Sequence, residues 1–194
     1  MITAAVLSGF VCIFIIVGIS GSSKANNTVI ATEWAFAKYT TKGSDYTSHI
    51  GLKRVVIRDK EEDTTTGYNF HECSFSYCSE CEKAGESTLS SLAIAFVFSI
   101  PGVIQSALRR NKETDLVLNK VFPVILGAIQ VLMLVIAMGA FANDCYEELP
   151  TSDSYELSTG FHCVLVALIF QIVIMCLHTL TPVTKATPGL LDSE

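Results

Sequence analysis

The stretch VFPVILGAIQVLMLVIAMGAFA, residues 121–142, contains no charged residue and decides the fold class of this chain. A helix rises about 1.5 Å per residue, so about 20 apolar residues are needed to cross a hydrocarbon core about 30 Å thick. Three further stretches have the same character, and the four predicted spans cover roughly residues 3–20, 88–108, 120–142 and 160–181. Each span must be helical because lipid offers no partner for backbone N–H and C=O groups. The sequence therefore predicts a mostly α membrane protein built as a four-helix bundle.

The composition agrees with this fold class. Half of the residues (50%) are hydrophobic and only 16% are charged, whereas a soluble domain of this size carries more charge. The formal net charge of −6 leaves no basic surface for a nucleic acid, which excludes that class of partner. We expect a single domain over residues 1–194, because the first loop is the only segment outside the spans long enough to fold.

The distribution of basic residues predicts the topology. The short loop 109–119 contains Arg109 and Arg110, whereas the loop 143–159 contains no Lys or Arg and is acidic. Short basic loops stay in the cytoplasm. We therefore expect both termini, including the tail 182–194, to be cytoplasmic and the first and third loops to lie outside. Arg109 and Arg110 are also expected to contact anionic lipid head groups.

The first span has a second interpretation as the apolar core of a cleaved signal peptide. Small residues follow it at Gly21, Ser22 and Ser23, as at a cleavage site. No basic residue precedes it, however, so we expect it to be retained as a membrane anchor.

The long outer loop 21–87 is predicted to form a small antiparallel sheet. Residues 28–39, 50–59 and 68–77 are rich in β-branched and aromatic side chains, and the polar stretch 60–67 reads as a long hairpin turn. Such a sheet buries little apolar area by itself, so we expect it to need support from disulfides or from the membrane-facing helices.

Four cysteines on the predicted outer side can supply that support. Cys73, Cys78, Cys81 and Cys145 all lie in the outer loops, where an oxidising environment favours two disulfides. Three pairings are possible, and we prefer one in which Cys145 joins the first-loop cluster. The alternative is a zinc site, because His71-x-Cys73 and Cys78-x-x-Cys81 have compact ligand spacing. We expect disulfides and no metal.

The chain has four predicted spans, a long β-forming first outer loop, Trp34 early in that loop and Gly51-Leu52 further on. In this combination it resembles the claudin, peripheral myelin protein and calcium-channel gamma-subunit superfamily. Members of the superfamily carry a Trp, then Gly-Leu-Trp, then two cysteines that close a strand pair. The match is partial, since Lys53 stands at the position of the second Trp and Val56 at that of the first Cys. The resemblance implies a tetraspan bundle with an extracellular sheet.

The sequence gives no sign of catalysis. None of His49, His71, His162 and His178 is spaced with Ser, Cys or carboxylates as in a known catalytic motif, and no nucleotide or metalloprotease motif is present. We expect neither enzymatic activity nor a cofactor.

Transport is also disfavoured, because transporters keep ionisable groups inside the membrane. The last three spans offer few polar side chains, namely Ser99, Gln105, Gln130, Gln171 and His178. We expect His178 to lie near the cytoplasmic interface.

One further motif concerns glycosylation. Asn26-Asn27-Thr28 is a sequon on the predicted outer side, so Asn26 is a candidate for N-glycosylation. It lies close to the first span, where access for the transferase is restricted.

Two functions fit the resemblance. The gamma-subunit members imply an accessory subunit that packs against a larger membrane complex, a channel or receptor. The claudin members imply an adhesion or barrier protein at cell junctions that associates with copies of itself through its outer loops. Claudins commonly end in a motif for PDZ domains, whereas this chain ends in Leu191-Asp192-Ser193-Glu194, so the accessory role in the plasma membrane is preferred.

Overall fold

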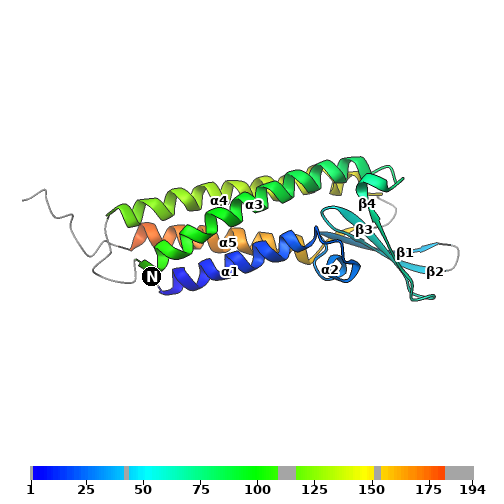
Figure 1. Cartoon of the computed structure of the whole chain (residues 1–194), viewed down its shortest axis with the longest axis horizontal. Coiled ribbons are helices and arrows are strands. Elements are labelled where there is room, and N and C mark those ends of the chain that lie inside the picture. Colours follow the sequence, from blue (N-terminus) through cyan, green and yellow to red (C-terminus); the bar gives the residue numbers. More distant parts are fainter. Residues whose placement is uncertain (1, 42–43, 109–116, 151–153, 182–194) are drawn as a thin grey trace, which may run out of the picture.

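The computed structural model describes residues 2–41, 44–108, 117–150 and 154–181, and within them four long helices carry a β-sheet at one end (Figure 1). The long helices are α1 (Ile2–Ser20), α3 (Cys78–Leu108), α4 (Val117–Asp144) and α5 (Thr159–Leu180). Each is long and apolar enough to cross a membrane. The prediction of four apolar helices is confirmed, and the chain is an integral membrane protein.

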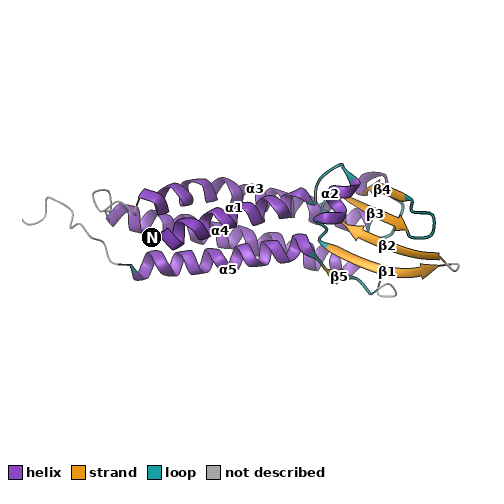
Figure 2. Ribbon diagram, turned by 90° about the horizontal axis from the view of Figure 1, so that it is seen from below, coloured by secondary structure: helices purple, strands orange, loops and turns teal. Residues whose placement is uncertain are grey.

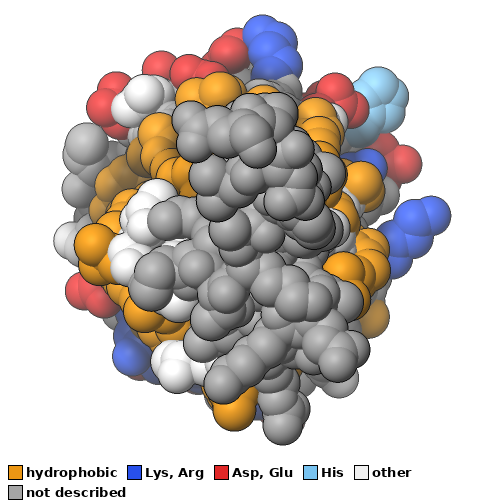
Figure 3. Space-filling view, turned by 90° about the vertical axis from the view of Figure 1, so that its left-hand side faces the viewer, with side chains coloured by type: hydrophobic (Ala, Val, Ile, Leu, Met, Phe, Trp, Pro, Cys, Tyr) orange, Lys and Arg blue, Asp and Glu red, His pale blue; other side chains and the backbone are white. Residues whose placement is uncertain are grey.

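The helices form a four-cornered bundle with an apolar outer surface. Helix α1 packs beside α3 and α5, and α4 packs beside the same two helices. Large side chains such as Ile13, Val97 and Ile125 are more than half exposed on the sides of the bundle. In the view from the end of the bundle away from the sheet, hydrophobic side chains are visible in a zone inside the rim and charged ones lie at the rim (Figure 3). This surface suits a hydrocarbon environment.

A five-stranded antiparallel sheet extends from one end of the bundle (Figure 2). Its strands are β1 (Ala35–Thr41), β2 (Ser44–Ile50), β3 (Arg54–Asp59), β4 (Thr65–Asn69) and β5 (Glu156–Leu157). Their order is β4-β3-β2-β1-β5, with β1 between β2 and β5. Because β5 belongs to the loop between α4 and α5, the sheet combines both loops at this end of the bundle.

The strand boundaries differ from the predicted ones. The run 28–39 begins in a short helix, α2 (Asn26–Ala31), and only its second half is strand. Strand β2 was not predicted, because Ser44–Ile50 is mostly polar and lacks a clear apolar face. The prediction of a strand over 68–77 is wrong. Strand β4 ends at Asn69, and a 3-10 helix η1 (Phe70–Glu72) follows it.

Helix α3 extends well beyond its predicted span. It begins at Cys78, whereas the apolar run begins near residue 88, so its first turns are polar and lie beside the sheet (Figure 1). Lys83 and Glu80 form an exposed i,i+3 ion pair of 2.9 Å in this part. The apolar pattern locates only the segment that faces lipid, so hydropathy alone missed the extension.

Polar side chains gather inside the half of the bundle that is distant from the sheet. His178 lies two residues before the end of α5, its side chain is fully buried, and its Nε2 lies 3.0 Å from Ser106 Oγ. A small void of about 10 Å³ adjoins Gln130, whose Nε2 has no partner among the described residues. A void of this size holds about one water molecule.

Candidate functional site

The part of the sheet distant from the bundle has a hollow on one face, which we call the tyrosine face. Its seven lining residues surround about 390 Å³ and are Tyr39, Tyr46, Ile57, Asp59, Thr64, Thr66 and Tyr68. Successive side chains of a strand alternate between faces, so the register brings these residues together. Tyr39 pairs with Tyr46, and their rings stack with centroids 5.7 Å apart. Tyrosine rings of this kind are enriched in protein interfaces.

The same sheet face is closed near the bundle. Ile50 and Val55 are fully buried there. The Tyr155 hydroxyl donates a 3.2 Å hydrogen bond to Ser48 Oγ, and the Tyr146 hydroxyl donates a 2.7 Å hydrogen bond to the Tyr155 carbonyl. The loop between α4 and α5 therefore covers the near half of this face and leaves the tyrosine face open.

The opposite face of the sheet carries a second hollow of about 390 Å³, which we call the basic groove. Lys38, Arg58 and Lys60 line it, together with the ring of Phe36. Lys38 Nζ lies 5.3 Å from the centroid of Phe36, and Arg58 forms a 2.7 Å ion pair with Asp63. The two faces of the sheet thus differ in chemistry, one aromatic and one cationic.

A buried polar pair lies at the base of the basic groove. The carboxylate of Glu33 contacts the imidazole of His49, and both residues are about 8% exposed. Ser158 Oγ donates a 2.7 Å hydrogen bond to Glu33 Oε1, and the amide of Gly160 donates one of 2.7 Å to the Glu33 carbonyl. Buried charge persists only where such partners are present. The pair fastens the start of α5 to the start of β1.

Trp34 joins the sheet to the bundle. Its indole Nε1 donates a 3.0 Å hydrogen bond to the carbonyl of Gly18 in α1. Its ring centroid lies 5.0 Å from that of Phe141 in α4 and 5.9 Å from that of Phe161 in α5. A Cβ atom at Gly160 would come within 2.7 Å of the indole, so glycine is needed there to admit the ring. One side chain thereby touches three helices.

Gly51 and Leu52 lie at the same junction as Trp34. The Trp34 amide donates to the Ile50 carbonyl at 2.8 Å, and the Leu52 amide donates to the Gly21 carbonyl at 2.9 Å. A Cβ atom at Gly85 of α3 would overlap the carbonyl of Leu52. The residues that carry the family resemblance therefore come together where the sheet meets the bundle.

Two disulfides hold the sheet end of α3. Cys81 is bonded to Cys145 and Cys73 to Cys78, one of the three pairings left open by the sequence. The Cys81–Cys145 bond links the first loop to the segment after α4, which is the arrangement preferred from the sequence. All four sulfurs are bonded, so none is free to bind zinc beside His71. Among the described residues no group of three or more His, Cys, Asp or Glu side chains is placed to hold a metal ion.

The remaining predicted site residues are placed as follows. Asn26 is the first residue of α2 and its side chain is half-buried. Arg109 and Arg110 lie outside the described residues.

Sequence reasoning missed Tyr46 and the Glu33–His49 pair. Both depend on β2, which places Tyr46 opposite Tyr39 and His49 opposite Phe36. The available signal was Gly43 between two runs containing Thr and Tyr, which is typical of a hairpin.

A scan against protein-family models and a search of curated proteins both found no match to this chain. The function of the site is therefore argued from the residues of this chain. The tyrosine face offers rings and hydroxyls, and the basic groove offers cations.

Proposed function

We propose that this protein is a non-enzymatic, claudin-like tetraspan accessory subunit. It packs its helices against a larger membrane complex, a channel or receptor, and lays its sheet on the extramembrane part of that partner. The observation that carries the proposal is the open tyrosine face on a sheet that is fixed to the bundle. Aromatic hollows of this kind serve as anchoring points in protein interfaces.

Rigid attachment supports this role. The sheet is joined to α1, α4 and α5 through Trp34, and the close approach of Gly85 to the Leu52 carbonyl sets the turn before β3 against α3. The Cys81–Cys145 bond ties α3 to the segment that leads from α4 to β5. A surface held in one orientation loses little conformational entropy when it binds, so more of the contact free energy remains as affinity. An accessory subunit benefits because its membrane helices and its sheet then engage one partner together.

The proposal places the sheet outside the cell and both termini in the cytoplasm of the plasma membrane. The two disulfides support this orientation, since disulfides persist on oxidising sides of membranes. The basic loop 109–119 supports it independently through the distribution of Lys and Arg.

A second candidate is an adhesion or barrier protein that associates with copies of itself. The observation in its favour is the edge strand β4, whose residues Thr65–Asn69 are mostly exposed. An exposed edge presents unpaired N–H and C=O groups to a strand of another chain.

The test is gentle detergent extraction of the tagged protein from its native membrane, followed by sizing and mass spectrometry. Wild type is compared with Tyr46→Ala and Tyr68→Ala on the tyrosine face, and with Lys38→Ala on the opposite face as the matched control. The accessory role predicts a larger integral membrane protein that is retained by wild type and by Lys38→Ala. It predicts that the Tyr46→Ala/Tyr68→Ala double variant loses this protein by about tenfold or more.

Recovery of only self-associated copies would favour the adhesion role. Equal retention of one partner by all the variants would remove the tyrosine face as the binding surface.

A further inference from the structure

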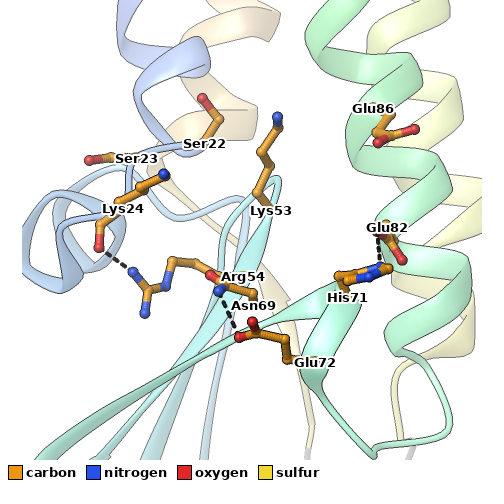
Figure 4. A pocket seen from close by; sticks show the side chains of 10 residues that line it. All are labelled: Ser22, Ser23, Lys24, Lys53, Arg54, Asn69, His71, Glu72, Glu82 and Glu86. Carbon is orange, nitrogen blue, oxygen red and sulfur yellow. Dashed lines mark hydrogen bonds and ion pairs between the residues drawn. The ribbon is translucent and has the colours of Figure 1, made fainter.

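A charged pocket of about 400 Å³ lies where the sheet meets α1 and α3 (Figure 4). Its basic wall comes from the segment after α1 and from the turn before β3, and contains Lys24, Lys53 and Arg54. Its acidic wall comes from α3 and contains Glu82 and Glu86. Figure 4 shows Lys53 extending into the space between the two walls. Glu72 of η1 also lines the pocket and accepts a 2.9 Å hydrogen bond from Asn69 Nδ2. The pocket therefore has a mainly basic wall that faces the acidic wall of α3, with a third carboxylate from η1.

Some of these groups already have partners within the protein. The Arg54 guanidinium donates to the Lys24 carbonyl, and Glu82 Oε1 lies 3.3 Å from His71 Nδ1. Lys53 and Glu86 form no ion pair with any residue that the structure describes. A ligand that fills the pocket thus meets an available cation on one wall and an available carboxylate on the other.

The packing of α1 against α3 shows where the pocket lies along the axis of the bundle. Cys12 Sγ of α1 lies 3.1 Å from Ser99 Oγ of α3, and a Cβ at Gly18 would lie 3.5 Å from Leu92. The two helices are antiparallel, so Glu86 lies about 9 Å beyond Leu92 toward the sheet, just past the end of α1. The pocket is therefore at the level where the apolar surface of the bundle ends.

Apolar side chains lie on both helices below the pocket. Ile16 of α1 is 49% exposed and Ile94 of α3 is 43% exposed. The same packing places them at one level, about 12 Å below Glu86. A molecule with a charged head and apolar chains matches a charged pocket followed by exposed apolar side chains on α1 and α3.

We propose that the pocket binds the head group of a zwitterionic phospholipid, with its phosphate beside Lys53 and its amine beside Glu86. The acyl chains then run past Ile16 and Ile94 in the leaflet on the sheet side. Phosphate and ammonium groups each gain a charge-assisted contact in this arrangement. A purely anionic head group satisfies Lys53 but leaves Glu86 without a counter-charge, so zwitterionic head groups are selected.

Native mass spectrometry of the purified full-length protein tests this assignment. The delipidated protein is mixed with equal amounts of phosphatidylcholine, phosphatidylethanolamine and phosphatidylglycerol that carry the same acyl chains. Wild type is expected to retain the two zwitterionic lipids in preference to phosphatidylglycerol. Lys53→Glu and Glu86→Gln should each lower their retention about tenfold, the usual effect of losing one charge-assisted hydrogen bond. Lys60→Glu makes the same charge reversal on the basic groove, away from this pocket, and should retain lipid as wild type does.

Three results would overturn the proposal. The first is equal retention of zwitterionic lipid by wild type, Lys53→Glu and Glu86→Gln. The second is phosphatidylglycerol retained as strongly as phosphatidylcholine. The third is free phosphocholine that binds as tightly as the lipid, which would assign the pocket to a soluble ligand. Glu86→Gln removes only a charge from an exposed side chain, so it keeps the test valid if Lys53→Glu fails to fold.

Discussion

The indole nitrogen of Trp34 lies 3.0 Å from the carbonyl oxygen of Gly18, so a residue at the base of the sheet caps the last turn of α1. The last carbonyls of a helix lack intrahelical partners, and a buried one needs a donor. The Gly21 amide donates to this carbonyl at 3.3 Å, and Trp34 supplies a second, closer donor while its ring packs against Phe141 and Phe161. The sheet and the bundle are therefore parts of one packed unit.

Trp34→Ala should lower the free energy of unfolding by about 3–5 kcal/mol, because it removes a fully buried ring and leaves a cavity. Trp34→Phe should cost less, since it keeps part of the ring and loses mainly a hydrogen bond of about 1 kcal/mol. Thermal unfolding in detergent measures both variants. Phe10→Ala is the control, because Phe10 is 45% exposed on the side of α1. A Trp34→Ala midpoint equal to that of the control would contradict the described junction.

Removing the two disulfides should have unequal effects. Cys81 and Cys145 are 64 positions apart, whereas Cys73 and Cys78 are 5 positions apart. Loop-closure entropy predicts about 4 kcal/mol for the long loop and about 2 kcal/mol for the short one. Double serine variants of each pair, compared by thermal unfolding under non-reducing conditions, check this order. The reverse order would show that the long loop is already held together without its bond.

Two alanine substitutions in α3 should change stability in opposite directions. A Cβ at Gly85 overlaps the backbone carbonyl of Leu52, so Gly85→Ala forces α3 away from the sheet and should cost about 1–3 kcal/mol. A Cβ at Gly102 meets no atom within 4 Å, so Gly102→Ala should gain about 1 kcal/mol from helix propensity. The thermal unfolding midpoints of Gly85→Ala and Gly102→Ala, each compared with wild type, measure the effect of the same chemical change at two sites. Similar shifts for both would mean that α3 does not approach Leu52 closely.

Gln130→Leu should leave the protein equally or more stable. The Gln130 side chain is 2% exposed and its Nε2 has no partner in the described part of the chain. Such a group costs about 1–3 kcal/mol in desolvation, which leucine avoids at similar volume. Leu134→Ala, one turn along α4 and fully buried, is the contrasting control and should lose about 2–5 kcal/mol. A clear loss of stability in Gln130→Leu would indicate that a bound water satisfies the amide.

The sequence predicts the bundle well because each uncharged run has only one way to satisfy its backbone in lipid. It also predicts that Cys145 reaches the first loop, since the other three outer cysteines all lie there and any pairing of the four into two disulfides includes such a bond. Trp34, Gly51 and Leu52 come together at the junction, a placement that the sequence did not predict.

The sheet is harder to predict from the sequence. Strand β2 is polar along most of its length, because His49 contacts the buried Glu33 and Thr47 Oγ1 lies 3.2 Å from His49 Nε2. The polar beginning of α3 carries no hydropathy signal, since it packs beside η1 and against Leu52 in the turn before β3. Long-range contacts determine these elements, and local patterns do not report them.

The two edges of the sheet are unequal. Strand β5 offers only Glu156 and Leu157 at one edge and is tied directly to α5, whereas β4 presents five residues at the other. Two copies that join through β4 in antiparallel fashion use the same surface twice and are related by a two-fold axis. Each copy then has no comparable edge left to offer a third. Pairing of two copies through β4 would therefore give a closed dimer and not a growing filament.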